Sequence, residues 1–241
     1  MINDQLTRVK ELKSLFDKGL IKSEHQHEVH PGLSKAERLN YLYFTLPVSL
    51  NYQRNSKALW ESALKTFTDP TTNYLFYPEL VVVETREKIQ ADLVKHKLAL
   101  QRNKHTDIWR TISQTLYDKY ASDPRNIIIE SEFDVIKIIN NVRVIKKKDF
   151  PYLSGAKMSN YWLYILHHYT DIKLINLNSI SIIPDTHIIQ ASIYLELVNS
   201  KATPDQVAQV WHNLLEDTEL IPIDLHPVLW NWSRNNFKPA V

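Results

Sequence analysis

Apolar residues recur at intervals of three and four along almost the whole chain, as they do on one face of an α-helix. The stretches "RNSKALWESALKTF" and "QVAQVWHNLLED" show this spacing most clearly. Residues 171–184, "DIKLINLNSISIIP", alternate enough to suggest a short extended segment, and the Ile run of "DPRNIIIE" suits either a short strand or a buried helix edge. We therefore predict an all-α fold of about ten helices with little sheet.

Capping residues mark the expected starts of several helices. Thr106 and Ser131 each precede a helical run, and Asp185 stands at the start of "THIIQASIYLELV". Thr203 is followed by proline, which suits an N-cap and the first helical position. A further helix is expected directly after Gly155. These positions divide the chain into helices without a flexible linker.

The composition excludes several classes of site. The chain has 241 residues, 44% of them apolar, which is enough for the core of one large domain. It has no cysteine, so a disulfide scaffold, a thiolate zinc site and a cysteine-ligated iron–sulfur cluster are excluded. The loop "HQHEVH" holds His25, His27 and His30, but their spacing matches no standard catalytic metal motif. We expect neither a metal nor a cofactor.

Charge and hydropathy narrow the location and the partners. The stretch "MINDQLTRVKELKSLF" is charged throughout, and no window reaches the ~18 apolar residues of a membrane span. We expect no signal peptide, no membrane partner and a cytoplasmic location. The net charge of +2 is small for a nucleic-acid binder, so a role of that kind must depend on local patches. The best patch is "RVIKKK", and Lys95, Lys97, Arg102 and Lys104 form a second.

The stretch "PYLSGAKMSNYWL" places two unusual residues at the start of a helical run. The chain has only three glycines, and one of them, Gly155, lies two residues before Lys157. Glycine permits a tight turn that approaches a ligand closely. Free helix N–H groups and the positive end of the helix dipole favour an anion there and disfavour a protonated amine. Lys157 is therefore a candidate nucleophile, although most lysines are simply exposed surface residues.

Asp185, in "IIPDTH", is the second candidate. It follows a proline and precedes a helical run, so it is expected to be an N-cap. A cap fixes a carboxylate rigidly, and capping is therefore compatible with a catalytic role.

The two stretches together resemble the helix-hairpin-helix DNA glycosylases of the Gly-Pro-Asp type. In that superfamily a hairpin ends in a catalytic lysine, and an aspartate follows about one helix and one loop later. Lys157 matches the lysine, and Pro184 with Asp185 matches the second motif. The resemblance places the helix-hairpin-helix at about residues 131–169.

Two further stretches are similar to one branch of that superfamily, the archaeal 8-oxoguanine DNA glycosylases. The stretch "LPVSLNYQRNSKALWESALKTF" is similar to their N-terminal Ser-Tyr-Gln run with its aromatic-Trp pair, and "PIDLHPVLW" is similar to their C-terminal helix. The four matching pieces span roughly residues 42–232 in the expected order.

The resemblance implies a fold and a set of roles. The fold is one helical glycosylase domain over residues 1–241, made of two intimately packed subdomains with the active site in the cleft between them. Lys157 and Asp185 are the implied catalytic residues. The implied contacts to the flipped base are Gln53, Tyr161, His226 and Trp230, and those to the DNA backbone are Gly155, Lys146, Lys147 and Lys148. Tyr161 and Trp230 read alone are core aromatics, and Gln53 read alone is a loop residue.

The chain departs from the family pattern at three places. The usual hairpin is Leu-Pro-Gly-x-Gly, whereas here either Leu153 occupies the first glycine position or one residue is inserted. Residues 54–56 replace a Gly-Lys pair, and His226 stands where those proteins carry an aspartate. These differences bear on the base that is read more than on the chemistry.

The resulting expectation is a base-excision repair glycosylase with lyase activity that removes 8-oxoguanine from double-stranded DNA. A carboxylate stabilises the oxocarbenium character of the transition state, and a lysine amine forms a Schiff base at C1′. We expect a monomer. One alternative is an N-glycosylase of a free modified nucleoside, similar to the queuosine-salvage enzymes. The other is a helical DNA-binding protein without catalysis, in which Asp185→Asn and Lys157→Gln would leave the function unchanged.

Overall fold

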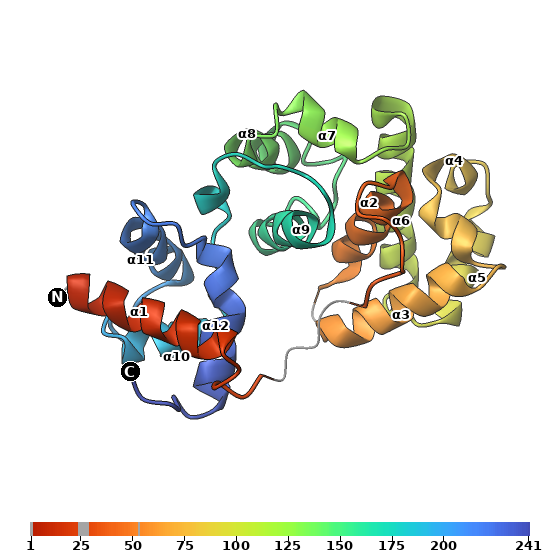
Figure 1. The fold of residues 1–241 in the computed structure, drawn as a ribbon. Coiled ribbons are helices and arrows are strands. Elements are labelled where there is room, and N and C mark those ends of the chain that lie inside the picture. Colours follow the sequence, from red (N-terminus) through yellow and green to blue (C-terminus); the bar gives the residue numbers. More distant parts are fainter. Residues whose placement is uncertain (1, 24–28, 53) are drawn as a thin grey trace. The chain divides into compact units, whose positions relative to one another are not determined.

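The computed structural model describes residues 2–23, 29–52 and 54–241, and this part of the chain is all-helical, as predicted (Figure 1). Its α-helices are α1 (Ile2–Asp17), α2 (Arg38–Thr45), α3 (Ser56–Thr68), α4 (Pro78–Val81), α5 (Arg86–Lys95), α6 (Arg102–Tyr120), α7 (Arg125–Glu130), α8 (Val135–Asn140), α9 (Ala156–Tyr169), α10 (Thr186–Tyr194), α11 (Pro204–Leu215) and α12 (Leu225–Arg234). The one π-helix in the described residues is η3 (Asn141–Ile145), and the four short 3-10 helices there are η1 (Pro47–Leu50), η2 (Asn73–Phe76), η4 (Leu177–Ser179) and η5 (Pro222–Asp224).

The chain divides into two compact units. Unit 1 comprises the described residues of Met1–His25 together with Asn176–Val241, and unit 2 comprises those of Gln26–Ile175. Unit 1 is therefore discontinuous in sequence, because α1 packs with α11 and α12 from the other end of the chain. The predicted site residues fall in both units.

The core of unit 1 is aliphatic with two buried tryptophans. Trp211 and Trp232 are both 0% exposed, and α10 packs along α12. The indole N–H of Trp211 donates to the hydroxyl of Ser192 at 2.8 Å, so the polar edge of a fully buried ring is satisfied. This packing positions the start of α10, where Asp185 lies.

The core of unit 2 is an aromatic cluster between α2, α3 and η2. Tyr43 lies at the centre, with its ring centroid 5.6 Å from that of Trp60 and 5.7 Å from that of Phe76. Helix α9 packs against α2 on one side and against α8 and η3 on another (Figure 1). The buried ring of Trp162 on α9 donates its N–H to Thr45 on α2 at 3.0 Å. These contacts fix the helix that carries Lys157.

Two of the expected helix starts are wrong. Helix α6 begins at Arg102, and Thr106 lies inside it with its hydroxyl bonded to the Arg102 carbonyl at 2.6 Å. Helix α8 is capped by Asp134, whose carboxylate accepts from the backbone N–H of Ile136 at 2.8 Å. Ser131 instead donates its hydroxyl back to the Ile127 carbonyl, at the end of α7.

The caps expected at Asp185 and at Thr203 are confirmed. Thr203 forms a full capping box with Gln206, and Pro204 occupies the first position of α11. The predicted extended segment amounts to one isolated parallel bridge, from Ile175 to Asp134. No strand forms in the described residues. Ile175 alone pairs beside the start of α8, where its N–H donates to the Phe133 carbonyl at 3.0 Å and its carbonyl accepts from the N–H of Val135 at 3.2 Å.

Candidate functional site

A helix, a turn and a second helix follow one another in the region where the hairpin is expected. Helix α8 continues into η3, the chain turns over residues 146–155, and α9 begins at Ala156. Leu153, in this turn, is 0% exposed and anchors the turn to the core of unit 2. The start of α9 is thereby held against the end of α8 and η3.

The left-handed residue of the turn is Tyr152, with φ +64°, and not Leu153 or Gly155. A bulky residue at positive φ is uncommon and carries backbone strain of order 1 kcal/mol or more. Tyr152 directly follows Pro151, so the turn places a left-handed residue next to a proline.

Gly155 has a different reason to be a glycine. Its backbone is ordinary, with φ −67°, so no left-handed conformation requires it. A Cβ atom at this position would lie 3.1 Å from the carbonyl oxygen of Tyr152, which is closer than an unstrained contact allows. The residue is the N-cap of α9 and supplies no side-chain cap, so the first N–H groups of α9 have no side-chain acceptor from the cap position.

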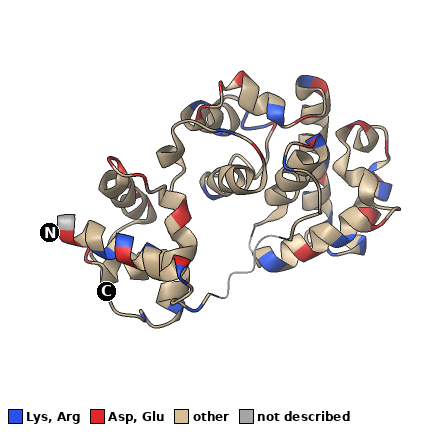
Figure 2. Cartoon of the chain, viewed as in Figure 1, with Lys and Arg blue, Asp and Glu red and all other residues tan. Residues whose placement is uncertain are grey.

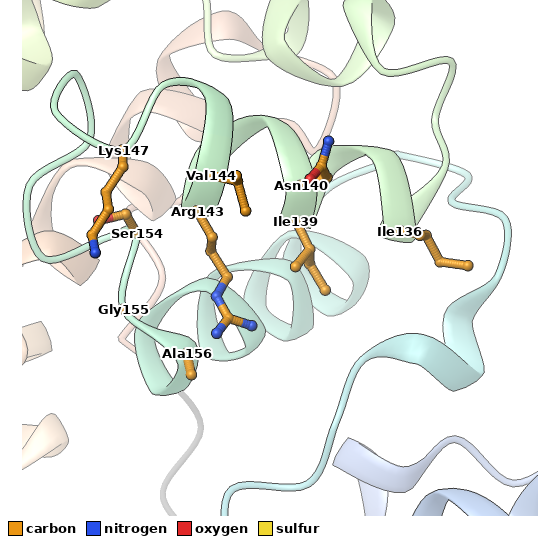
Figure 3. Close-up of a pocket in the computed structure, with 9 residues that line it drawn as sticks. All are labelled: Ile136, Ile139, Asn140, Arg143, Val144, Lys147, Ser154, Gly155 and Ala156. Carbon is orange, nitrogen blue, oxygen red and sulfur yellow. The ribbon is translucent and has the colours of Figure 1, made fainter.

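An open pocket of about 570 Å³ lies beside this helix start (Figure 3). Figure 3 shows the side chain of Arg143 extending toward the first turn of α9 and that of Lys147 lying beside Ser154 in the preceding turn. Ile136 and Val144, which also line the pocket, are 56% and 68% exposed. The pocket thus combines an apolar wall, two cations and a helix N-terminus, and this set of groups suits an anion attached to an apolar body.

Lys157 is the second residue of α9, next to this pocket, and it is exposed. No residue in the described part of the chain bonds its ammonium group. One turn further along α9, the half-buried Tyr161 accepts a hydrogen bond from the buried indole of Trp60 at 2.9 Å. Tyr161 is therefore fixed at its hydroxyl, while Lys157 remains free to move.

The basic run before the turn does not act as one patch. The ammonium of Lys146 lies 2.7 Å from both carboxylate oxygens of Glu130 and 2.6 Å from the hydroxyl of Tyr120. Burial opposes the charge, but these hydrogen bonds raise the pKa of Lys146 above its ordinary value. Lys147 and Lys148 are exposed. The cations available to an external partner are therefore these two lysines with Arg143.

The second basic patch is also divided. Lys95 pairs with Asp69 at 2.7 Å, and Lys97 adopts a left-handed backbone with φ +59°. Arg102 and Lys104 are exposed in the first turn of α6. Figure 2 shows the same mixture over the molecule, with acidic and basic residues interspersed along the helices.

Asp185 is the N-cap of α10 in unit 1. One of its carboxylate oxygens accepts hydrogen bonds from the backbone N–H groups of His187 and Ile188, both at 3.0 Å. The side chain is half-buried and its position is fixed by the helix. A carboxylate in this position is stabilised by the helix dipole and cannot rotate freely.

Two residues after Asp185, His187 joins a group of aromatic and cationic side chains in unit 1. The ring of His187 meets the ring of Trp230 edge to face at 5.3 Å, and the guanidinium of Arg234 lies 4.7 Å from the centre of Trp230. His187 is also bonded to the hydroxyl of Ser233 at 3.2 Å. His226 lies one turn before Trp230 on α12. The sequence pattern did not single out His187 or Arg234, which carry no motif signal apart from their positions near Asp185 and Trp230.

The predicted residues thus form two groups. Gly155, Lys157 and Tyr161 lie along α9 in unit 2, and Asp185, His226 and Trp230 lie on α10 and α12 in unit 1. Gln53, His25 and His27 lie outside the described residues. Among residues 2–23, 29–52 and 54–241, no three His, Cys, Asp or Glu side chains gather to hold a metal.

Within the same ranges no helix combines the length and the apolar character needed to cross a membrane. Neither a protein-family model nor a curated protein matches this sequence.

Proposed function

We propose that this chain is a base-excision DNA glycosylase with lyase activity, acting on an oxidised purine such as 8-oxoguanine. The observation that supports it best is the start of α9. There an exposed lysine without a bonding partner in the described residues adjoins a tight turn, uncapped helix N–H groups and a pocket with two cations. Lys157 would attack the sugar while these groups hold a neighbouring phosphate.

Lys157 suits the role of nucleophile because of its freedom and its place on the helix. The side chain is exposed in the first turn of α9, beside the backbone N–H groups that would hold a phosphate. Arginine could not replace it, because a guanidinium does not lose its proton. The absence of an ion-pair partner in the described residues leaves the amine available.

Asp185 suits the role of electrostatic stabiliser because its carboxylate is held in place. The C1′ atom gains positive character as the bond to the base breaks, and a fixed carboxylate stabilises that charge without having to reorganise. The proposal assigns Asp185 to charge stabilisation and Lys157 to attack in the same reaction. It assigns the flipped base to Tyr161, Trp230, His226 and Gln53, on the resemblance alone.

The proposed reaction has three stages. The lone pair of the Lys157 amine forms a bond to C1′, the C1′–N bond breaks, and its electron pair leaves with the base, which takes up a proton. The bound amine loses one proton, the C1′–O4′ bond breaks with its electron pair going to O4′, which takes up a proton, and a protonated imine is left between Lys157 and C1′. Loss of a proton from C2′ then expels the 3′ phosphate and cuts the strand.

The backbone contact is assigned to Gly155, Lys147 and Lys148, with Arg143 added. Lys146 is left out of that set, because its ammonium is already engaged by Glu130 and Tyr120. With one cation fewer, we expect the duplex affinity to be modest and strongly dependent on salt.

Borohydride trapping tests the proposal. Wild type and Lys157→Gln would be incubated with duplexes that carry 8-oxoguanine or an abasic site, and the reduced mixtures analysed for a protein–DNA adduct. We expect an adduct with wild type and none with Lys157→Gln. No adduct from folded wild type on either duplex would reject the lyase, and an adduct that persists in Lys157→Gln would reject Lys157 as the nucleophile.

A second candidate function is the hydrolysis of a free modified nucleoside. It is favoured by the small net charge of +2 and by the loss of Lys146 to an internal ion pair. On this proposal Asp185 stays essential, Lys157 is dispensable and duplex affinity is poor. Release of base from modified nucleosides by the wild type, abolished in Asp185→Asn but kept in Lys157→Gln, would support it over the DNA lyase.

A further inference from the structure

Three residues from distant parts of unit 2 meet on its surface. Tyr52 follows η1, Lys104 lies in the first turn of α6, and Tyr152 lies in the turn before α9. The rings of the two tyrosines contact each other edge to face, with centroids 5.3 Å apart and planes at 66°. The ammonium of Lys104 lies 4.7 Å from the centre of the Tyr152 ring and 5.8 Å from that of Tyr52. We refer to these three residues as the Tyr52 cluster.

The Tyr52 cluster is open to an external partner. Tyr52 is 43% exposed, which is high for a large aromatic side chain. Within the described ranges neither tyrosine hydroxyl has a hydrogen-bond partner, and Lys104 forms no ion pair. Tyr152 adopts a left-handed backbone, φ +64°, which is uncommon for a bulky residue.

A hollow adjoins the cluster. It measures about 390 Å³ and is lined by Asn103, Lys104, Asp107, Ile108, Thr111 and Pro151. The only acidic residue in that set, Asp107, pairs with Arg86 at 2.9 Å, so its charge is compensated. The hollow therefore offers an apolar floor beside a cation, and its size admits a planar group such as a nucleobase.

Positive charge gathers at the same place. Arg102 and Lys104 are both exposed in the first turn of α6. Helix α6 is 19 residues long and has no side-chain N-cap, so its first N–H groups and its dipole add to the positive potential. Aromatic rings with cations beside them match the two parts of a nucleotide, the flat base and the charged phosphate.

We infer that the Tyr52 cluster is a stacking site for an unpaired nucleobase of single-stranded DNA. The base stacks on the exposed ring of Tyr52, which Tyr152 holds from the side, and the adjacent phosphate binds Lys104 and Arg102. Stacking on an aromatic ring tolerates any base, so the site would show little sequence preference. The inference goes beyond the proposed function, because it requires no chemistry at Lys157.

Fluorescence anisotropy with a labelled oligothymidine tests the inference. Tyr52→Ala should weaken binding roughly 5- to 100-fold, the usual loss when one stacked ring is removed. Tyr52→Phe should bind as wild type does, since stacking needs the ring and not the hydroxyl. Lys104→Gln should weaken binding and reduce the slope of log affinity against log salt by about 0.7. Tyr117→Ala is the matched control, because Tyr117 is 49% exposed on α6 outside the cluster, and it should change nothing.

An oligonucleotide of the same length with abasic tetrahydrofuran sugars separates stacking from phosphate binding. Wild type should bind this probe more weakly than oligothymidine, and Tyr52→Ala should bind both probes equally. The inference is overturned if folded wild type binds no oligothymidine, if Tyr52→Ala and Tyr117→Ala lose the same amount, or if wild type does not distinguish the two probes. Tyr52-dependent binding without a borohydride adduct would keep the site and reject the lyase, and the reverse result would keep the lyase and reject the site.

Discussion

The two helices that carry the proposed catalytic residues begin in opposite ways. In unit 1, α10 begins with a side-chain cap, and Asp185 is held by two backbone N–H groups at 3.0 Å. In unit 2, α9 begins at a glycine without a side-chain cap, and Lys157 in its first turn has no bonding partner in the described residues. A group that stabilises developing charge gains from being fixed, whereas a nucleophile must travel to its carbon. The proposed roles, a mobile nucleophile and a fixed charge stabiliser, require this contrast.

The same physical feature acts on the two residues with opposite sign. The positive end of a helix dipole stabilises a nearby carboxylate and destabilises a nearby ammonium, each by about 0.3–1 kcal/mol at an exposed position. The two helix starts can be disturbed separately, which makes the comparison testable.

The largest effect is expected from Lys157→Arg. The variant keeps the positive charge but cannot lose a proton, so the borohydride adduct should disappear completely. The thermal midpoint should change little, because the ammonium has no bonding partner among the described residues. Trapping and a thermal melt measured on the same preparation check both parts. An adduct formed by Lys157→Arg would show that another residue is the nucleophile.

The second-largest effect is expected from Asp185→Asn. Asparagine caps a helix about as well as aspartate, so stability should stay within about 0.5 kcal/mol of wild type, while base release slows by about 100-fold or more. Single-turnover kinetics with denaturant unfolding measures both quantities. Asp185→Ala is the matched control, since it removes the charge and the cap together and should also lower the free energy of unfolding by about 1 kcal/mol. If Asp185→Asn retains full activity, the carboxylate is a cap and nothing more.

Acid should lower the stability of unit 2 through the protonation of His105. Burial, together with the charges of Arg54 and Lys104, lowers the pKa of His105 to about 4. The unfolded chain therefore binds the extra proton between pH 6.5 and 4, and stability should fall as the pH drops through that window, by at most about 1.4 kcal/mol per pH unit. Denaturant unfolding across that range measures the slope, which should be shallower in His105→Gln. An unchanged slope in the variant would show that His105 is not the group responsible.

The smallest effect is expected from Gly155→Ala. The added Cβ would meet the Tyr152 carbonyl at 3.1 Å, so the turn must move by a few tenths of an ångström. Alanine is also a poorer N-cap than glycine, while the unfolded chain loses entropy in compensation. We expect a loss of less than about 1 kcal/mol in the free energy of unfolding. A loss of several kcal/mol in the free energy of unfolding would show that the turn is too rigid to move away from the added Cβ atom.

The sequence was sufficient for the fold class and for the caps at Asp185 and Thr203, because helical spacing and capping are local. It misplaced the starts of α6 and α8 for a local reason as well. The hydroxyls of Thr106 and Ser131 can bond backward to a carbonyl as readily as forward to an N–H, and in both cases they do so. Asp134, three residues after Ser131, offered a stronger acceptor for the cap.

The candidate site was only partly predictable. Lys157 and Asp185 carry motif signals, whereas the engagement of Lys146 by Glu130 depends on a contact between segments 16 residues apart. The Tyr52 cluster joins residues near positions 52, 104 and 152, and no local pattern relates them. Such long-range contacts are decided by packing, which a single sequence does not display.

The discontinuity of unit 1 has a consequence for the order of events on the ribosome. Residues 26–175 emerge as one continuous stretch, so the unit that carries Lys157 has all of its partners early in synthesis. The α1 segment emerges first of all, yet its partners on α11 and α12 come late. A nascent chain halted before α12 would therefore display the lysine on a finished scaffold while the support for the aspartate was still missing.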